Sequence, residues 1–398
     1  MKKLTILMLT LAMALGVPAM SSADESITIT FWHTYGDAET PLIDNVIIPM
    51  FEAANPDIKV EAIRQSGDFN QMLVTAFGTG VVPDVARVDI TKTSAYAKLG
   101  GIVRMDEIDG FESLKAAVLE GPLSTNLWNG HYYGLPLNTN CKAAVINLAN
   151  MKTLGFDGAP TTMESFIEAC KENAPDEYKL NVSGLGDWDM YTYFWLFGGN
   201  VTDEGFTRAS GYLDSAESVA ALEAIIRMHD EGVFTIRDVD GTPDAWDGIN
   251  SQYAMFFEGP WYPFSETIVP ALIPSYNGQS ASIVGGENIV IFTGSTKQEA
   301  AFKFVSFMMG EDVQLKLLEV GVIPTLKSCV NSEAVQSDPK WSVYMQQLTD
   351  ARSRIPSPQA SVIELLWTDA MAMIWMEGAD IQETLTMIAA EMDIELAK

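Results

Sequence analysis

The sequence predicts an α/β protein built from two lobes. Short strand patterns alternate with helix patterns along the chain, which indicates a mainly parallel sheet covered by helices. About 375 residues follow a leader-like segment at the N-terminus, which is more than one hydrophobic core usually supports. Hydrophobic residues make up 47% of the chain, a normal content for a globular protein.

In chain order, apolar residues recur at two-residue steps in strands and at three- and four-residue steps in helices. These patterns predict strands at 27–31, 58–62, 83–89 and 143–146, and helices at 42–54, 69–77, 93–99, 219–226, 297–309 and 361–376. Pro49 should kink or split the first helix. Ligands of such sheets bind at the carboxyl ends of strands, where Trp32, His33 and Asp89 stand.

The first 23 residues have the pattern of a cleavable signal peptide. Two lysines precede the apolar run 4–17, and the small residues Ser21 and Ala23 stand just before the expected cleavage point. The run is shorter than the roughly 20 residues of a spanning helix. A retained anchor is the alternative, but it leaves the small residues without a purpose. No cysteine follows the cleavage point, so we expect a soluble periplasmic protein rather than a lipoprotein.

Charge and cysteine content narrow the partners. The chain carries 24 Lys+Arg against 53 Asp+Glu, a net charge of −29. Such a surface repels phosphate backbones and anionic lipids, so neither nucleic acid nor a membrane surface is an expected partner. Cys141, Cys170 and Cys329 are the only cysteines. An oxidising compartment permits one disulfide among them, and the pairing stays open.

Several enzyme signatures are absent from the sequence: GxSxG, GxxxxGK[ST], HExxH, and GxGxxG after a strand. With three histidines in the chain, we expect no metal site and no cofactor. The acidic stretch 238–244 reads as a surface loop, because its glycine comes too early for a calcium loop. Asp187 and Asp189 flank Trp188, and together with Glu258 they leave a glycosidase as the alternative function.

Aromatic and polar residues occur together in four stretches: 32–35, 138–140, 187–191 and 258–262. A sugar presents hydroxyls at its edge and apolar C–H groups on its faces. It is held by flat aromatic rings together with ionised or amide side chains. Core packing is the alternative for any one tryptophan. Trp32 and Trp261 lie beside glycine or proline turns, where loops carry function.

A series of longer motifs spans nearly all of the chain after the leader. In order they are ITITFWHTYGD, FEAANPDIKVEAI, GTGVVPDVARVD, AYAKLGGIVRMDE, GHYYGLPLNTN, AMFFEGPW, GGENIVI, AAFKFVSFMMGEDVQ and GVIPT. In this order and spacing the chain resembles the extracellular solute-binding proteins of family 1. That group includes maltose-binding protein and other sugar-binding components of ABC importers.

The resemblance implies a type II periplasmic binding protein fold, in which two α/β lobes close over a ligand. Three crossing segments are implied near 136–140, 283–287 and 321–327. The first lobe would comprise 24–137 and 284–325, and the second lobe 138–283 and 326–398.

The resemblance also implies ligand contacts, with Trp261 as a stacking ring, Asp89 as a hydroxyl acceptor and Arg354 as a cleft-lining cation. The full set is Trp32, His33, Tyr35, Asp89, Asn138, Trp188, Tyr191, Trp261, Gly286, Glu287 and Arg354. The match to maltose-binding protein fails at its late stacking tryptophan. Trp367 is displaced and reads as a core residue, so maltose is not implied.

We therefore expect a monomeric binding protein, not an enzyme, that captures a mono- or oligosaccharide and delivers it to the permease of an ABC transporter. A binding subunit of a sensor is a further alternative. The acidic charge disfavours a sugar phosphate, although Arg354 keeps one open.

Overall fold

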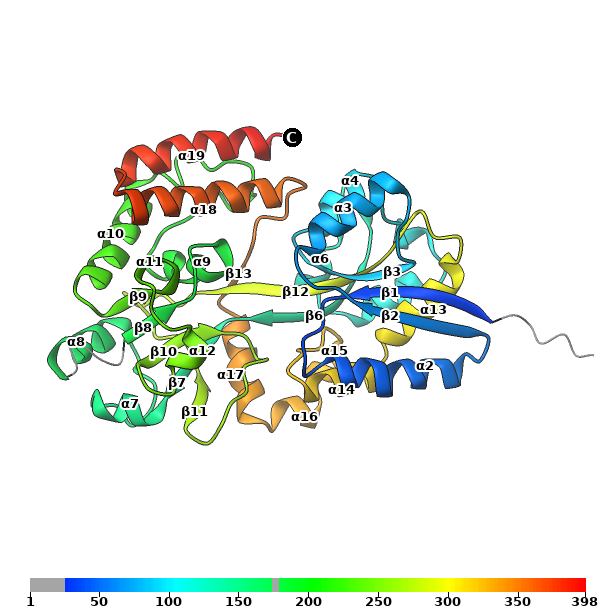
Figure 1. Ribbon diagram of the computed structural model, residues 1–398, viewed down its shortest axis with the longest axis horizontal. Helices are drawn as coiled ribbons and strands as arrows, with labels where there is room; N and C mark the ends of the chain where they lie inside the picture. The colour runs from blue at the N-terminus through cyan, green and yellow to red at the C-terminus, as the bar shows by residue number, and fades with distance from the viewer. Residues whose placement is uncertain (1–25, 174–178) are drawn as a thin grey trace, which may run out of the picture.

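The computed structural model describes residues 26–173 and 179–398. The predicted signal peptide over 1–23 lies outside the described residues. Two lobes, each with its own sheet and its own core, lie side by side (Figure 1). The predicted α/β fold of two lobes is confirmed. Within the described ranges, no helix is both long and apolar enough to cross a membrane.

The first lobe is built on a six-stranded sheet of order β13-β12-β3-β1-β2, with β6 paired to β12. Its strands are β1 Ile27–His33, β2 Ile58–Arg64, β3 Val85–Asp89, β6 Leu135–Cys141, β12 Ser282–Ile291 and β13 Ala351–Ser353. β1 pairs in parallel with both β2 and β3. The residues that end β1 and β3 therefore lie at one edge of the sheet.

Helices cover both faces of this sheet. The helices are α1 Thr40–Leu42, η1 Ile43–Ile47, α2 Ile48–Ala54, α3 Phe69–Thr79, α4 Thr93–Lys98, η2 Met105–Glu107, α5 Phe111–Ala117, α6 Glu120–Ser124, α13 Gln298–Met308, α14 Glu311–Glu319 and α15 Lys327–Val330. A short antiparallel hairpin is formed by β4 Leu127–Trp128 and β5 His131–Tyr132. Phe31 packs edge-on against Phe304 on one face, and Trp32 packs against a separate cluster on the other. The alternation of side chains along β1 produces this division.

The helix predicted over 42–54 is split, as Pro49 requires. A π-helical segment, η1, directly precedes the α-helix α2 that contains Pro49 near its start. Proline has no N–H to donate to the carbonyl four residues earlier, and a wider turn accommodates the missing bond.

The second lobe has a five-stranded sheet of order β11-β7-β10-β8-β9. Its strands are β7 Ala143–Asn147, β8 Lys179–Val182, β9 Phe234–Ile236, β10 Tyr253–Glu258 and β11 Ile268–Ala271. Its helices are α7 Leu148–Thr153, α8 Met163–Asn173, α9 Asp187–Leu196, α10 Ala216–Asp230, α11 Arg237–Asp240, α12 Ala245–Gly248, α18 Ala360–Glu377 and α19 Ile381–Leu396. Trp367 on α18 is fully buried, and its Nε1 donates to the carbonyl of Leu185 at 3.1 Å. The expectation that Trp367 is a core residue is confirmed.

Both sheets are mixed, whereas the sequence pattern predicted mainly parallel sheets. β12 runs antiparallel to β3 and β6, and β7 runs antiparallel to β10 and β11. A two-residue periodicity identifies a strand but carries no information about its direction. The antiparallel pairs arise where the chain passes between the lobes and returns.

The pair β6–β12 forms the connection between the lobes (Figure 1). Residues 321–327 lie beside it, since Thr139 N donates to the carbonyl of Ile323 at 3.1 Å. α16 Glu333–Gln336 and α17 Pro339–Leu348 pack at the same junction, in a cluster that includes Cys141 and Ile323. The three segments expected to cross between the lobes are therefore neighbours.

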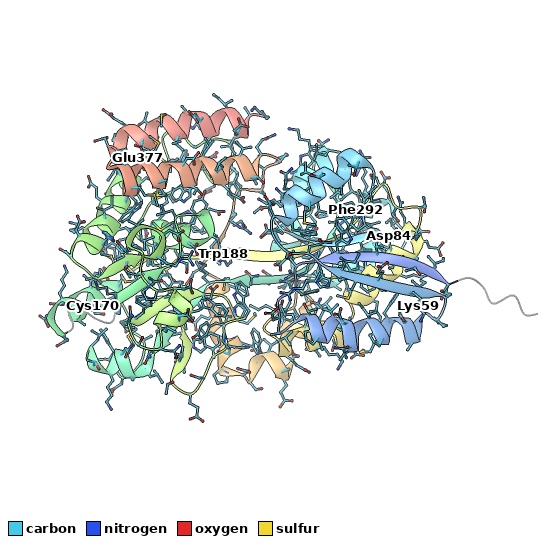
Figure 2. All side chains as sticks on the ribbon, in the orientation of Figure 1. Lys59, Asp84, Cys170, Trp188, Phe292 and Glu377 are labelled. Carbon is cyan, nitrogen blue, oxygen red and sulfur yellow. The ribbon has the colours of Figure 1, made fainter. Side chains whose placement is uncertain are left out.

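The three cysteines are buried in three separate core clusters. Cys170 lies well out in the second lobe (Figure 2), whereas Cys329 belongs to the core of the first lobe and Cys141 to the junction. Disulfide formation requires Cα atoms within about 7 Å of each other. The disulfide that the sequence permitted is not formed in this arrangement.

Gly286 should not tolerate a side chain. It has φ +136°, and a Cβ there would lie 2.5 Å from the carbonyl oxygen of Asn138 on the paired strand. We expect Gly286→Ala to lower the free energy of unfolding by about 2 kcal/mol or more, through strain and the clash. Urea unfolding measures this loss. The control is Gly158→Ala, where φ is not positive and no atom lies within 4 Å. Equal stability of the two variants would contradict the prediction.

Candidate ligand-binding cleft

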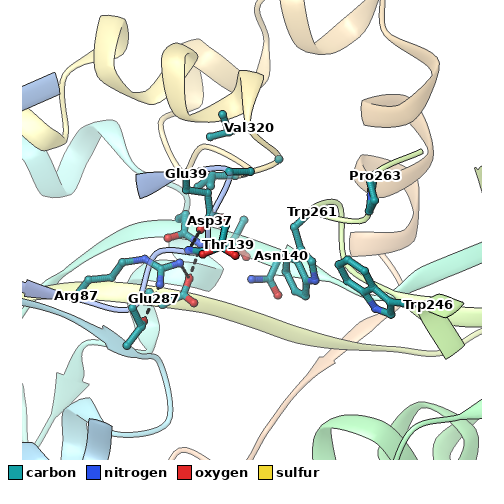
Figure 3. A pocket seen from close by; sticks show the side chains of 16 residues that line it. Asp37, Glu39, Arg87, Thr139, Asn140, Trp246, Trp261, Pro263, Glu287 and Val320 are labelled. Atoms are coloured by element: carbon teal, nitrogen blue, oxygen red, sulfur yellow. Dashed lines mark hydrogen bonds and ion pairs between the residues drawn. The ribbon is translucent and has the colours of Figure 1, made fainter. Parts of the chain in front are cut away.

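A cavity of about 530 Å³ lies at the junction of the lobes (Figure 3). The loop after β1 forms one wall, β6 and β12 form the floor, and the tryptophan-bearing loops of the second lobe form the opposite wall. The lining residues are Thr34, Gly36, Asp37, Ala38, Glu39, Arg87, Asn138, Thr139, Asn140, Trp246, Trp261, Pro263, Glu287, Val320, Gly321 and Val322. Carboxylates and tryptophan rings thus come from different lobes and face a shared space.

A second cavity, of about 180 Å³, adjoins the first. The two share Asn140, Trp261 and Glu287, so they are neighbouring parts of one cleft. The second cavity is also lined by Asp89, Trp188, Gly285, Gly286 and Arg354. Figure 2 shows Trp188 near the middle of the molecule, where the two lobes meet.

An ion pair and two amides make the floor polar. Arg87 contacts Glu287 at 2.8 Å, and Asn138 Nδ2 donates to Glu287 Oε2 at 2.6 Å. Burial raises the pKa of Glu287, although the charge of Arg87 opposes the rise. The Oδ1 atoms of Asn138 and Asn140 are buried without a hydrogen-bond partner among the described residues. A buried acceptor without a partner is unfavourable, and the side chains that carry these two atoms line the cavity.

Tryptophan rings supply apolar surface above this floor. The ring of Trp261 lies over Gly259, where a Cβ would overlap it. Trp188 stacks on Trp261 with ring centroids 6.2 Å apart. Trp246 is 36% exposed, and its Nε1 donates to Glu258 Oε2 at 3.0 Å. The glycine and the hydrogen bond fix these rings, which favours stacking on an apolar face.

Arg354 lies between carboxylates of both lobes and forms ion pairs with them. Its Nη2 donates to both carboxylate oxygens of Asp89, at 3.0 and 2.8 Å. Asp187 and Glu364, from the second lobe, each lie 3.9 Å from the guanidinium. Lys92, which follows β3, contacts Glu364 at 2.6 Å. This cluster, formed by Asp89, Lys92, Asp187, Arg354 and Glu364, is called the Arg354 cluster below.

The carboxylates of the Arg354 cluster differ in their protonation. Burial alone would raise the pKa of Asp89, but Arg354 and the hydrogen bonds from Thr91 outweigh it and lower the pKa. Burial raises the pKa of Asp187 to about 6, against the opposing charge of Arg354 and with the support of Glu364. The pKa of Asp89 therefore lies below its ordinary value, whereas that of Asp187 lies well above it.

The remaining acids of the glycosidase alternative are engaged in contacts within the protein. Asp189 Oδ1 accepts from Lys142 at 3.0 Å. Glu258 accepts from Trp246 and from the backbone N–H of Gly259. Asp187, Asp189 and Glu258 thus hold neighbouring parts of the cleft wall in place.

Seven of the expected ligand contacts come together in the cleft: Asp89, Asn138, Trp188, Trp261, Gly286, Glu287 and Arg354. The described residues that line its two cavities do not include Trp32, His33, Tyr35 or Tyr191.

His33 and Tyr35 point into the core of the first lobe, because alternation along β1 places them on the same face as Phe31. The His33 ring lies between those of Phe31 and Tyr35, with centroids 5.3 and 5.2 Å away. Burial, together with Arg87 and Arg64, lowers the pKa of His33 to about 4. A neutral, 1% exposed histidine supports the wall of the cleft from behind.

Trp32 and Tyr191 are also packed away from the cleft. Trp32 lies against the second core cluster of the first lobe. Tyr191 is 2% exposed, and its ring packs edge-on against Trp367. On α9, the residue that reaches the cleft is Trp188, in the first turn.

The structure adds cleft residues that sequence reasoning missed: Asp37, Glu39, Arg87, Asn140 and Trp246. Arg87 had a usable signal, since it is a charged residue inside the otherwise apolar strand 85–88. Asn140 stands in the same amide motif as Asn138. No sequence pattern pointed to Trp246, because the position of α12 beside the cleft depends on tertiary packing.

Replacing Asp187 by asparagine should stabilise the protein at neutral pH. A carboxyl whose pKa is higher in the folded than in the unfolded state lowers stability as pH rises from about 4 to about 6. We expect Asp187→Asn to gain about 2 kcal/mol over the wild type at pH 7.5, with the gain shrinking toward pH 4.5. Unfolding by urea at several pH values measures it.

The matched control is Asp247→Asn, an exposed acid in the first turn of α12, which should show no such pH-dependent gain. A gain for Asp187→Asn that is as large at pH 4.5 as at pH 7.5 would contradict the assignment.

Two curated relatives cover most of the chain. A maltotriose-binding protein of Pyrococcus abyssi is 22% identical over 368 residues, covering 84% of this chain and 74% of the relative. An sn-glycerol-3-phosphate-binding periplasmic protein of Escherichia coli is 22% identical over 325 residues, covering 75% of this chain and 74% of the relative. The names of these two relatives indicate different ligand classes, an oligosaccharide and a phosphorylated polyol.

Solved structures share the fold over nearly the full length. The GacH receptor of Streptomyces glaucescens superposes with a TM-score of 0.84 at 20% identity, covering 94% of this chain and 99% of that one. The maltose-bound MalE3 of T. maritima gives 0.81 at 22% identity, covering 93% and 100%. The family model for bacterial extracellular solute-binding proteins matches residues 47–343. The chain therefore belongs to the bacterial extracellular solute-binding protein family, whose members are binding proteins and not enzymes.

Proposed function

We propose that this protein captures a mono- or oligosaccharide in the cleft and delivers it to the permease of an ABC importer. The observation that carries the proposal is that the rings of Trp188, Trp246 and Trp261 line the same cleft as the amides of Asn138 and Asn140 and the carboxylate of Glu287. Rings cover the apolar faces of a sugar, and amide or carboxylate oxygens accept its hydroxyls.

Relatives support a carbohydrate ligand. Proteins that share the fold or the sequence pattern include a maltotriose-binding protein and structures bound to maltose and acarbose. Family membership favours binding over turnover, so the glycosidase alternative has no support. The ligand contacts that we propose are Asp89, Asn138, Asn140, Trp188, Trp246, Trp261, Gly286, Glu287 and Arg354.

Binding is coupled to closure of the lobes in this proposal. The first lobe comprises most of 26–141 and 284–330, with β13 added to its sheet, and the second comprises most of 143–281 and 360–398. Trp188 and Trp261 belong to the second lobe and Asp89 to the first, so a sugar completes its contacts only when the lobes approach. The ligand then shifts the population toward the closed form by its difference in affinity for the two forms.

The proposed site of action is the periplasm. The signal-peptide pattern over 1–23 supports export, and the absence of a cysteine after the cleavage point favours release over lipid attachment. The closed form would dock on the permease, and opening would release the sugar.

A thermal-shift screen against mono-, di- and trisaccharides and polyols tests the function. A sugar at about 100 times its Kd should stabilise the protein by about 2.7 kcal/mol, which raises Tm by several degrees. Recovery of the sugar chemically unchanged supports binding. Consumption of the sugar would contradict the proposal, and so would the absence of any shift across the panel.

Replacing Trp261 tests the location of binding. Trp261→Ala removes the ring shared by both cavities, and we expect the Kd for the best sugar of the screen to rise at least about tenfold. Isothermal titration calorimetry measures the change. The control is Trp128→Ala, a half-buried tryptophan that contacts Tyr133 in the first lobe. If both variants bind like the wild type, the sugar lies elsewhere.

A further inference from the structure

We propose that the cleft selects uncharged sugars and rejects phosphorylated ones, and that Asp89 is the residue that determines this selection. The inference rests on the proposed function and specifies its substrate class. The cleft contains cations that a phosphate would seek, but carboxylates of the protein already occupy them.

Among the described residues, the cations Arg87 and Arg354 line the cleft and Lys142 lies over the ring of Trp188, and each of the three has a close carboxylate partner. Arg87 contacts Glu287 at 2.8 Å, Lys142 contacts Asp189 at 3.0 Å, and Arg354 contacts Asp89 at 2.8 Å. The three cationic side chains are only 7%, 4% and 10% exposed. A phosphate that took the place of one of these carboxylates would leave the displaced carboxylate, itself partly buried, without its cation, which is unfavourable.

The charges around Arg354 are the strongest argument that the cleft rejects a phosphate. Within the Arg354 cluster, the carboxylates Asp89, Asp187 and Glu364 face the cations Arg354 and Lys92. The cluster therefore has an excess of negative charge before any ligand arrives. A phosphate dianion that approaches Arg354 is repelled by these carboxylates at short range, where solvent screens weakly.

Asp89 cannot readily move aside for an anion. Thr91 donates to Asp89 Oδ1 from its backbone N–H at 2.8 Å and from its hydroxyl at 2.7 Å. These bonds hold the carboxylate in place independently of Arg354. Asp89 also lies at the end of β3, where pairing with Glu287 on β12 fixes its backbone.

The balance of hydrogen-bond donors and acceptors in the cleft also favours an uncharged sugar over a phosphate. The side chains of Asn138 and Asn140 line the cleft, and their Oδ1 atoms accept no hydrogen bond within the described residues. The unpartnered donors nearby are the Nε atoms of Arg87 and Arg354. A sugar hydroxyl can donate to the acceptors, whereas a phosphate dianion can only accept. A donor-rich, uncharged ligand therefore matches this cleft.

The test is a gain of function. Binding of glucose 6-phosphate, glycerol 3-phosphate and inorganic phosphate is measured by calorimetry at low salt for the wild type and for Asp89→Asn. Asparagine keeps an oxygen for Thr91 but removes the charge that neutralises Arg354. We expect the Kd of the variant for at least one of these anions to be about tenfold or more below that of the wild type. The gain should diminish with added NaCl.

Two further variants make the result specific. Asp44→Asn removes an exposed acid from η1 of the same lobe, and its affinity for these anions should equal that of the wild type. Glu287→Gln, which frees Arg87, repeats the experiment at a second cation, and Asp89→Ser, which also removes the carboxylate from Arg354, serves as the test of Asp89 if Asp89→Asn does not fold.

The outcomes are distinguishable from those of the proposed function. If a neutral sugar binds the wild type and a folded Asp89→Asn gains no affinity for anions, the role of Asp89 is overturned. If the wild type binds glucose 6-phosphate or glycerol 3-phosphate more tightly than glucose or glycerol, the exclusion itself is overturned. If no sugar binds in any form, the proposed function fails and this inference fails with it.

Discussion

The antiparallel pairing of β6 with β12 is the constraint on which the rest of the structure depends. These two strands connect the lobes and also form the floor of the cleft, so structure and site are built from the same residues. Asn138 on β6 and Glu287 on β12 are register partners, and a hydrogen bond of 2.6 Å joins their side chains. Any shift of this register would displace both the hinge and the ligand-facing acceptors.

The cleft is polar at its floor and aromatic on its wall because different physical demands apply there. The charged side chains of the floor are largely buried, so they must be paired, and Arg87 with Glu287 satisfies this requirement. The wall is reached by solvent, where Trp246 can remain 36% exposed. The same pairing that permits burial of Arg87 and Arg354 makes them unavailable to an anion in our proposal, so the groups that stabilise the cleft also determine which ligand it selects.

Sequence reasoning predicted the architecture better than the site. Periodicity identified β1, β2, β3 and β7, and Pro49 correctly predicted the interruption of a helix. Periodicity could not give strand direction, so the mixed sheets were missed. Resemblance pointed to the residues of the crossing strands and to Trp261, because these positions depend on local turn and strand motifs.

The misplaced contacts have a common cause. His33 and Tyr35 stand next to a strand end that does face the cleft, but side-chain alternation turns them into the core. Tyr191 lies one turn beyond Trp188 on α9, on the side that packs against Trp367. A sequence motif locates a loop or a helix turn, whereas the direction of each side chain depends on packing between distant segments.

The most direct measurement of the central claim is a crystal structure of the protein with the best sugar from the screen. The account predicts the sugar between the lobes, with a ring stacked on Trp261 and hydroxyls donating to Asn138 Oδ1, Asn140 Oδ1 or Glu287. A sugar bound on the outer surface of one lobe, with this cleft filled only by water, would contradict it.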